Sequence, residues 1–206
     1  MSNNYAIKTI TAPTDEPIDS TEVKKHIAID SSETTFDTQI NDYITAARMY
    51  IEAETGRQIC TATYDLIVDR FPAGRVAINI PKGQLQSITH IKYIDTDGTQ
   101  QTLSSSKYKV SDSREPGIIQ PAFDEVWPVS RREIDSVEIR FVCGYGDSTV
   151  TPEGIKQAAL LLVGHYFEHR EAVAFNNVAS VVPLALQNIL AHYKIGEGFL
   201  WFDPAR

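Results

Sequence analysis

The chain has 206 residues, 42% of them hydrophobic and 22% charged, which is the composition of a globular protein with one large domain or two small ones. Its net charge of −8 disfavours tight binding to duplex DNA, because such binding requires clustered Lys and Arg. The N-terminal segment lacks the pattern of a signal peptide, and no apolar run approaches the length of a membrane-spanning helix. We therefore expect a protein that is made in the cytoplasm and has no membrane partner.

Residues 1–17 contain two prolines and little hydrophobic periodicity, so they predict an extended N-terminal arm. A short helix is expected at about residues 20–29, because Asp19 and Glu22 have the spacing of a capping box. The folded part of the chain is therefore expected to begin near residue 18.

The next segment gives the clearest helix prediction. From Phe36 onward, apolar side chains recur at helical spacing, and Gly56 stands where a left-handed C-terminal cap belongs. Ser31 or Ser32 is the expected N-cap. The apolar stripe covers one side only, and Arg48 is assigned to the polar side.

Between residues 61 and 150 the hydrophobic period changes from helical spacing to two, which predicts strands. The segments are ATYDLIVDRF, RVAINIP, SITHIKYID, KYKVSD, GIIQPAF and DSVEIRFVCGYG. Turn residues stand between them, for example at Ala73-Gly74 and Asp97-Gly98. Because the connections are short, we expect antiparallel pairing.

Helical spacing returns after residue 150, where Thr151 is the expected N-cap and Pro152 suits the first turn. A further helix is expected at 183–193. The predicted fold class is α+β, with a small helical bundle, an antiparallel β-rich insertion between the second and third helices, and extended arms at both ends. The expected parts are an N-terminal arm at 1–17, a helical ring-forming domain at 18–60 plus 151–195, an inserted β-rich region at 61–150 and a C-terminal tail at 196–206.

The stretch HYFEH matches the H-x-x-E-H motif of some zinc peptidases, with His165 and His169 as ligands and Glu168 as general base. A zinc hydrolase also needs a third ligand, and the few acidic residues that follow are poorly placed to supply one. The alternative is the end of an amphipathic helix, with Tyr166 and Phe167 facing inward. We favour this structural interpretation and predict no metal site.

Other chemical motifs are equally weak. Cys60 and Cys143 predict two buried free thiols, although a disulfide or a metal role stays open. The stretch DTDG at 95–98 resembles the start of a calcium loop, but position 12 of such a loop would be Ser106, so a hairpin turn is favoured. No phosphate loop or nucleophile elbow is present. We predict no catalytic residues, no cofactor and no enzymatic activity.

The C-terminal tail is unusually apolar. Phe199, Leu200, Trp201 and Phe202 are consecutive large apolar residues, which are costly to leave in water. The tail either folds back on its own core or inserts into a partner, with its aromatic residues as anchors.

A series of short motifs runs through the chain in a defined order. They are Ala46-Ala47-Arg48, Ile51-Glu52, Thr55-Gly56-Arg57, Tyr64 with Phe71-Pro72, Ile80-Pro81, Ser87-Ile88, Tyr93-Ile94-Asp95 with Asp97-Gly98, Trp127-Pro128, Phe141 with Gly144-Tyr145-Gly146, Pro152 with Ile155-Lys156-Gln157-Ala158, and His165-Tyr166-Phe167-Glu168-His169-Arg170. In order and spacing these motifs resemble the head–tail connector proteins of tailed phages, also called adaptor or head-completion proteins. The resemblance covers about residues 18–195.

The resemblance implies a structural protein of the virion neck. Such proteins form a ring, commonly of twelve subunits, beneath the portal, and DNA passes through the ring without specific binding. The implied partners are the portal protein, neck or tail completion proteins and further copies of the chain itself. C-terminal segments in this family dock on the portal, so Phe199, Leu200, Trp201 and Phe202 are the expected portal contacts. A tail-completion or other neck role is the alternative.

Overall fold

The computed structural model describes residues 5–169 and 184–195, and the chain divides into two compact units. Of the described residues, 5–12, 61–144 and Ile195 belong to a unit that we call the β unit. Residues 13–60, 145–169 and 184–194 belong to the helical unit. Each unit has its own hydrophobic core, so we describe each separately.

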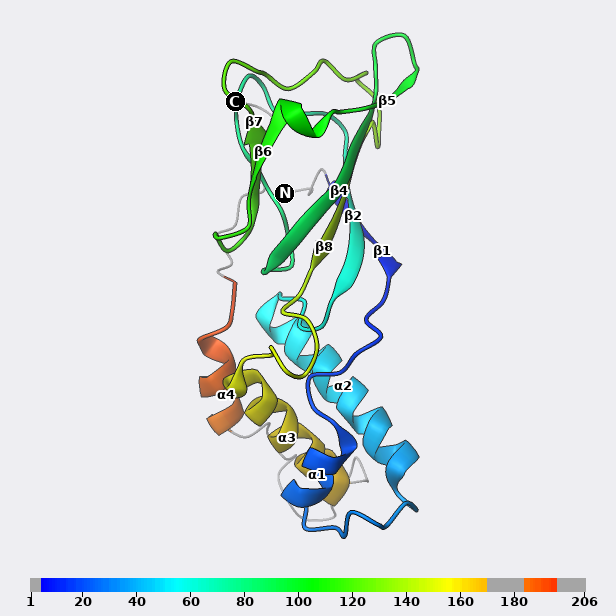
Figure 1. Ribbon diagram of the computed structural model, residues 1–206, viewed down its shortest axis with the longest axis vertical. Coiled ribbons are helices and arrows are strands. Elements are labelled where there is room, and N and C mark those ends of the chain that lie inside the picture. Colours follow the sequence, from blue (N-terminus) through cyan, green and yellow to red (C-terminus); the bar gives the residue numbers. More distant parts are fainter. Residues whose placement is uncertain (1–4, 170–183, 196–206) are drawn as a thin grey trace, which may run out of the picture. The chain divides into compact units, whose positions relative to one another are not determined.

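Every strand found among the described residues belongs to the β unit (Figure 1). They are β1 (Tyr5–Thr11), β2 (Ala62–Val68), β3 (Ile78–Asn79), β4 (Leu85–Ile94), β5 (Gln100–Thr102), β6 (Tyr108–Ser111), β7 (Ile118–Pro121) and β8 (Val137–Cys143), with a short 3-10 helix at Ser105–Lys107. They form a five-stranded sheet in the order β1-β2-β8-β4-β5 and a three-stranded sheet in the order β3-β7-β6. Every strand pair is antiparallel, as the short connections predict.

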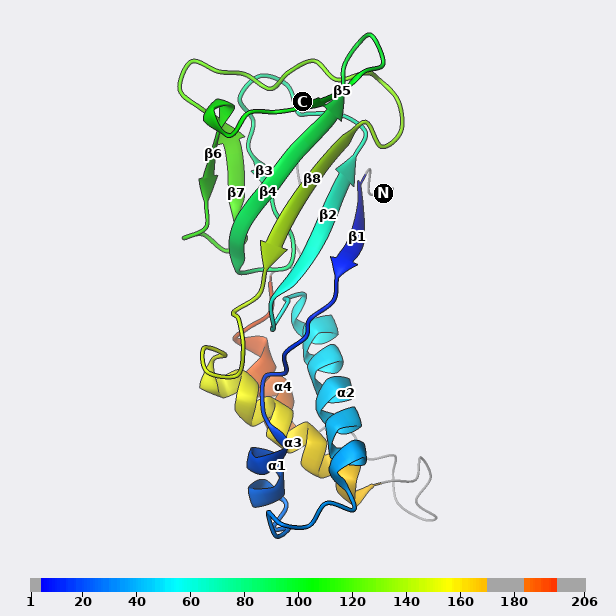
Figure 2. The ribbon, with the colours of Figure 1, turned by 45° about the vertical axis from the view of Figure 1, so that its right-hand side comes forward.

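The core of the β unit lies between its two sheets (Figure 2). In β8 the buried residues alternate with half-buried ones, as the period of two predicts. Phe141 of β8 is opposite Tyr64 of β2, and their rings stack with centroids 5.8 Å apart. Ile78 of β3 and Ile119 of β7 join the same cluster from the smaller sheet. Fully burying one such side chain stabilises the fold by about 1.5–3 kcal/mol.

The N-terminal segment differs from the predicted arm. Residues 5–11 are extended, but they form strand β1, which pairs with β2 at the edge of the five-stranded sheet. Ile7, for example, is opposite Leu66. A sequence pattern cannot reveal this pairing, because an edge strand with most side chains exposed shows little alternation.

The DTDG stretch forms the predicted hairpin turn, between β4 and β5. The Asp95 carboxylate accepts hydrogen bonds from the backbone N–H groups of Asp97 and Thr99, at 3.0 and 2.9 Å. Gly98 has φ +86°, which favours glycine. The hydrogen bond that Gln101 donates and the one from Thr99 lower the pKa of Asp95. This carboxylate therefore organises the turn.

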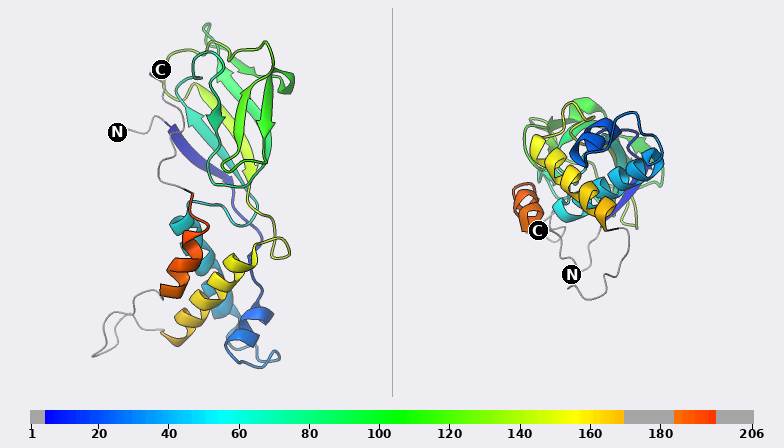
Figure 3. Two further views of the ribbon diagram at one scale, coloured as in Figure 1. Left: turned by 90° about the vertical axis from the view of Figure 1, so that its left-hand side faces the viewer. Right: turned by 90° about the horizontal axis from the view of Figure 1, so that it is seen from below.

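The helical unit contains α1 (Ser20–His26), α2 (Asp37–Thr55), α3 (Glu153–Glu168) and α4 (Leu184–Ala191). The right panel of Figure 3 shows α3 (yellow) between α1 (dark blue) and α4 (orange). The helices share one core to which α2 and α3 contribute their apolar stripes. Within the described part of the chain, no helix is long and apolar enough to cross a membrane.

The helix ends confirm some sequence signals and correct others. Asp19 and Glu22 form the predicted capping box of α1, and Gly56 ends α2 with φ +69°. The predicted N-cap of α2 at Ser31 or Ser32 was wrong, because the helix begins only after Phe36. Residues before it use their side chains in local turns, which compete with a helix start.

The start of α3 also differs by one residue from the prediction. Pro152 occupies the N-cap position, and Glu153 is the first helical residue. Thr151 is buried and donates its hydroxyl hydrogen to the backbone oxygen of Asp147 at 2.8 Å. Its side chain thus closes the preceding turn and does not cap the helix.

Candidate assembly surfaces

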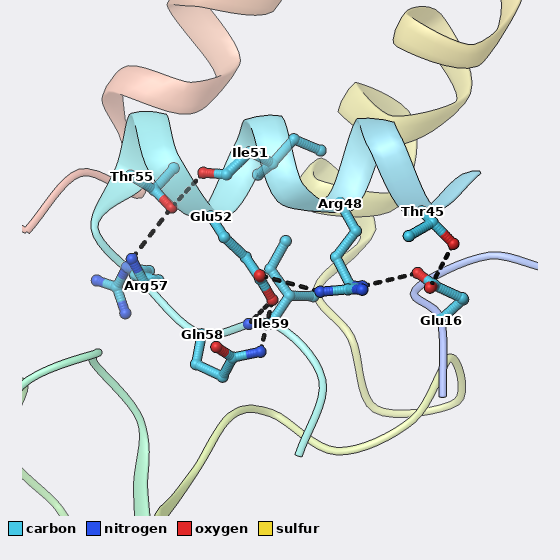
Figure 4. Close-up of polar contacts among 9 residues, drawn as sticks. All are labelled: Glu16, Thr45, Arg48, Ile51, Glu52, Thr55, Arg57, Gln58 and Ile59. Carbon is cyan, nitrogen blue, oxygen red and sulfur yellow. Dashed lines mark hydrogen bonds and ion pairs between the residues drawn. The ribbon is translucent and has the colours of Figure 1, made fainter. Parts of the chain in front are cut away.

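A buried arginine organises the helical unit (Figure 4). Arg48 is only 7% exposed, and its guanidinium donates to Glu16 at 2.8 Å and to Glu52 at 3.0 Å. The sequence analysis assigned Arg48 to a polar face, which was wrong. Burial is possible here because two carboxylates compensate its charge. Burial acts to lower the pKa of Arg48, but the hydrogen bond with Glu16 and the charge of Glu52 outweigh it and raise that pKa.

The same network extends to neighbouring segments of the helical unit. Thr45 donates to Glu16 at 2.9 Å, while Glu52 accepts from the Gln58 amide at 2.6 Å and from the Ile59 backbone at 3.1 Å. These contacts join α2 to the segment before α1 and to the segment after Gly56 (Figure 4). Hydrogen bonds and ion pairs therefore stabilise the helical unit in addition to its apolar core.

The Thr55-Gly56-Arg57 motif has a defined structural role. Thr55 donates its hydroxyl hydrogen to the Ile51 backbone oxygen at 2.6 Å. Arg57 donates to the backbone oxygen of Tyr193 and, at 3.1 Å, to the hydroxyl of Tyr145. These contacts tie the end of α2 to the segment after α4, so the motif fixes the shape of the helical unit.

The two cysteines are buried free thiols, as predicted. Cys60 is in the helical unit, and Cys143 is in the β unit. Burial raises the pKa of the Cys60 thiol to about 12, and the nearby Glu16 carboxylate acts in the same direction. The thiol is therefore protonated at neutral pH, which is typical of a packing role.

The HYFEH stretch forms the last turns of α3. His165 is inside the helix and His169 caps it, with their ring centroids 4.6 Å apart. His169 is also hydrogen-bonded through Nδ1 to the backbone oxygen of His165 at 3.2 Å, and Glu168 is exposed. Within residues 5–169 and 184–195, His, Cys, Asp and Glu nowhere gather in a group of three that could hold a metal.

Tyr166 packs against the helical core, as the amphipathic interpretation predicts, and Phe167 contacts Phe36, which packs against the same core. The Tyr166 ring lies 5.9 Å from that of Tyr43, and Phe167 meets Phe36 edge-on at 5.6 Å. Such aromatic pairs are favourable beyond the area they bury. This part of the motif therefore packs α3 against α2.

A recess of about 410 Å³ lies in the helical unit and has an acidic lining. Its carboxylates belong to Asp15, Glu16, Asp19 and Asp147. A hydrogen bond from the Thr149 side chain lowers the pKa of Asp147. The recess is suited to cationic side chains and poorly suited to apolar ones.

The β unit exposes apolar side chains on its loops. Val76 is in the β2–β3 connection, and the other four are in the β7–β8 connection. Their exposed fractions are Val76 47%, Phe123 85%, Val126 61%, Val129 76% and Ile134 80%. We call these five residues the loop patch. The two connections are adjacent, since the Trp127 indole N–H donates to the Val76 backbone oxygen, and exposed apolar residues on adjacent loops are typical of protein contact sites. The sequence analysis missed the patch, although apolar residues without periodicity between two strands could have indicated it.

The predicted portal contacts at Phe199, Leu200, Trp201 and Phe202 lie outside the described residues. Their role stays a prediction.

Comparison with known proteins identifies the family. The model of the head completion protein family matches residues 16–195. The chain belongs to this family. No curated protein gives a significant match to the sequence.

Solved structures of gene transfer agent particles contain chains with the same fold. A chain in the neck of the empty particle, with C6 symmetry, has a TM-score of 0.75 and 19% identity, over 94% of this chain and 97% of that one. A chain in the virion of the native particle gives 0.74 and 19%, over 94% and 97%. The native neck with C12 symmetry gives 0.69 and 18%, over the same shares. Family and fold confirm the predicted connector resemblance and the α+β class.

Proposed function

We propose that this head completion protein forms the adaptor ring of a phage neck, between the portal of the head and the next neck or tail proteins. The observation that carries the proposal is the family match over residues 16–195, together with a fold shared with neck proteins. The protein would act through shape and surface burial, without turnover. The folded units described above supply fixed surfaces for such a role.

We assign ring formation to the helical unit and expect twelve subunits. A ring needs two different surfaces on each subunit that meet head to tail. The C12 and C6 symmetries of the related necks are compatible with this number. The Arg48 network and the Arg57 contacts would keep these surfaces in a fixed geometry.

DNA would pass through the ring without specific contacts. A net charge of −8 supports this, because a conduit that attracted phosphates would retard the DNA.

The tail residues Phe199, Leu200, Trp201 and Phe202 would dock on the portal, with the aromatic side chains as anchors. Deleting residues 197–206 should leave a folded protein that binds the portal poorly. Normal assembly of the truncated protein on the portal would disprove this contact.

Cryo-electron microscopy of intact particles tests the main proposal. We expect density for the chain as a ring directly beneath the portal. Density at another position in the particle would overturn the adaptor role. Zinc in stoichiometric amount in the purified protein, lost in a His165→Ala/His169→Ala variant, would instead support a hydrolase.

A further inference from the structure

The side chains of the loop patch are exposed, yet the backbone that carries them is held in place by a buried side chain. Trp127 lies among the patch residues in sequence, is only 5% exposed and stacks on Phe71, with ring centroids 5.1 Å apart and planes inclined by 5°. Its indole N–H donates to the Val76 backbone oxygen at 2.7 Å, and its backbone N–H donates to Gly74 at 3.2 Å. The two loops that carry the patch are therefore joined by one buried side chain.

The segment around Phe123 has further anchors. The backbone N–H of Ala122 donates to the Lys107 oxygen at 3.0 Å, and that of Glu125 donates to Ala122 at 3.1 Å. The Lys107 ammonium and the Glu125 carboxylate form an ion pair at 2.6 Å. Phe123 is thus presented on a fixed loop, and a preformed surface loses less entropy on binding.

The patch also carries a cationic group beside its most exposed aromatic ring. Arg75 lies 6.0 Å from the centre of the Phe123 ring, and it forms no ion pair with any residue of the described part of the chain. A partner carboxylate could therefore reach this guanidinium beside the apolar surface.

We infer that the loop patch is a docking site for a different protein of the neck, one that offers an apolar recess to Phe123 and a carboxylate to Arg75. This inference rests on the proposed neck function. A second copy of the chain is the weaker occupant, because the acidic recess described on its helical unit could receive Arg75 but is poorly suited to the phenyl ring of Phe123.

Photo-crosslinking in assembled particles tests the inference. Phe123 is replaced by p-benzoylphenylalanine, purified particles are irradiated, and crosslinked products are identified by mass spectrometry. The matched control carries the same group at Val150, which is 58% exposed but belongs to the helical unit. We expect position 123 to crosslink to another virion protein and position 150 not to capture that protein.

Three results would overturn the inference: crosslinking of position 123 only to copies of the same chain, no crosslink in particles that contain the chain, or the same partner captured from position 150. If wild-type necks lack the chain altogether, the proposed function itself fails. That result is visible without any variant.

Charge and size variants give a second, independent measurement. Phe123→Ser and Arg75→Glu should reduce the yield of complete particles by about tenfold or more, as loss of an interface anchor does. Thermal unfolding should not change, since both side chains are exposed. Val150→Ser is the control and should give normal yields. Normal yields for both patch variants would contradict the inference.

Discussion

The two units of this protein differ in how their ion pairs are buried. In the β unit, buried apolar side chains from two sheets meet directly, and the buried Asp65 carboxylate forms a bidentate ion pair with Arg140, whose side chain is 31% exposed. In the helical unit, an apolar core is accompanied by a buried guanidinium held between two carboxylates. Both units therefore combine packing with charge compensation. In the β unit the cation of the pair is partly exposed to water, whereas in the helical unit the guanidinium itself is buried.

This difference matters for an assembly protein. If the helical unit forms the proposed ring, it must keep its surfaces in a fixed geometry. A buried charged network favours one geometry, because a displacement leaves a buried charge without compensation. The β unit instead carries long loops on an apolar sandwich, and the loop patch is exposed on these loops. Four substitutions can break or sharpen this comparison.

The largest effect is expected from Phe141→Ala in the β unit. Phe141 is fully buried, so the cavity should lower the free energy of unfolding by about 4 kcal/mol. Val142→Ala is the matched control. Val142 is the next residue in β8, and its side chain is half-buried on the other face of the sheet, so the substitution should lower the free energy of unfolding by about 1 kcal/mol. Denaturant unfolding measures both. Hydrogen exchange should show the loss of protection in β2 and β8. Equal loss in α2 and α3 would mean that the two units unfold together.

Arg48→Ala should have the largest effect on the helical unit among changes to charged residues. It leaves Glu16 and Glu52 without their shared cation, so we expect a loss of about 3 kcal/mol. The exposed ion pair of Arg131 with Glu133 provides the control, and Arg131→Ala should cost less than about 1 kcal/mol.

A triple variant separates packing from charge in this network. Arg48→Met with Glu16→Gln and Glu52→Gln removes all three charges and should recover part of the lost stability. If Arg48→Ala unfolds at the same denaturant concentration as the wild type, the helical unit does not depend on charge compensation, and the comparison of the two units fails.

Much of this fold was predictable because the hydrophobic period of each segment matches the face that the segment buries in the structure. The period of two located β2, β3, β4, β6, β7 and β8, and the apolar stripes located α2 and α3. The pattern does not include β5, whose three residues are all exposed. The capping box and Gly56 worked because both signals act within a few residues. Strand β1 was missed, since its partner is more than fifty residues away in sequence and its own side chains are mostly exposed.

The candidate surfaces were harder to predict for a related reason. Burial of Arg48 depends on Glu16, which is outside α2, and no helical pattern reports a partner in a distant segment. The loop patch depends on Trp127 joining two connections that are far apart in sequence. The zinc hypothesis at HYFEH was weak because a short motif carries no information about a third ligand elsewhere.

The third prediction concerns pH. The folded pKa of Cys60 is raised to about 12, against an ordinary value of 9.0. Between these values the unfolded chain binds fewer protons at this thiol than the folded one, so stability falls as pH rises from about 9 to about 12, by at most about 1.4 kcal/mol per pH unit. Below pH 9 the effect disappears. A Cys60→Ala variant should show a shallower decline over this range in denaturant titrations at a series of pH values. Parallel curves for the two proteins would show that Cys60 does not contribute.

The smallest effect is expected from Asp19→Ala at the start of α1. The substitution removes the 2.7 Å hydrogen bond that the Glu22 backbone N–H donates to the Asp19 side chain. The backbone N–H of residue 19 still donates to the Glu22 side chain. Loss of such a cap costs about 1 kcal/mol. Thr21→Ala, at an exposed position inside the same helix, is the control and should be close to neutral. Faster hydrogen exchange should be confined to α1, because the Arg48 network holds α2 independently of this cap. Faster exchange throughout α2 would instead show that the cap and the charge network act as one cooperative element of the helical unit.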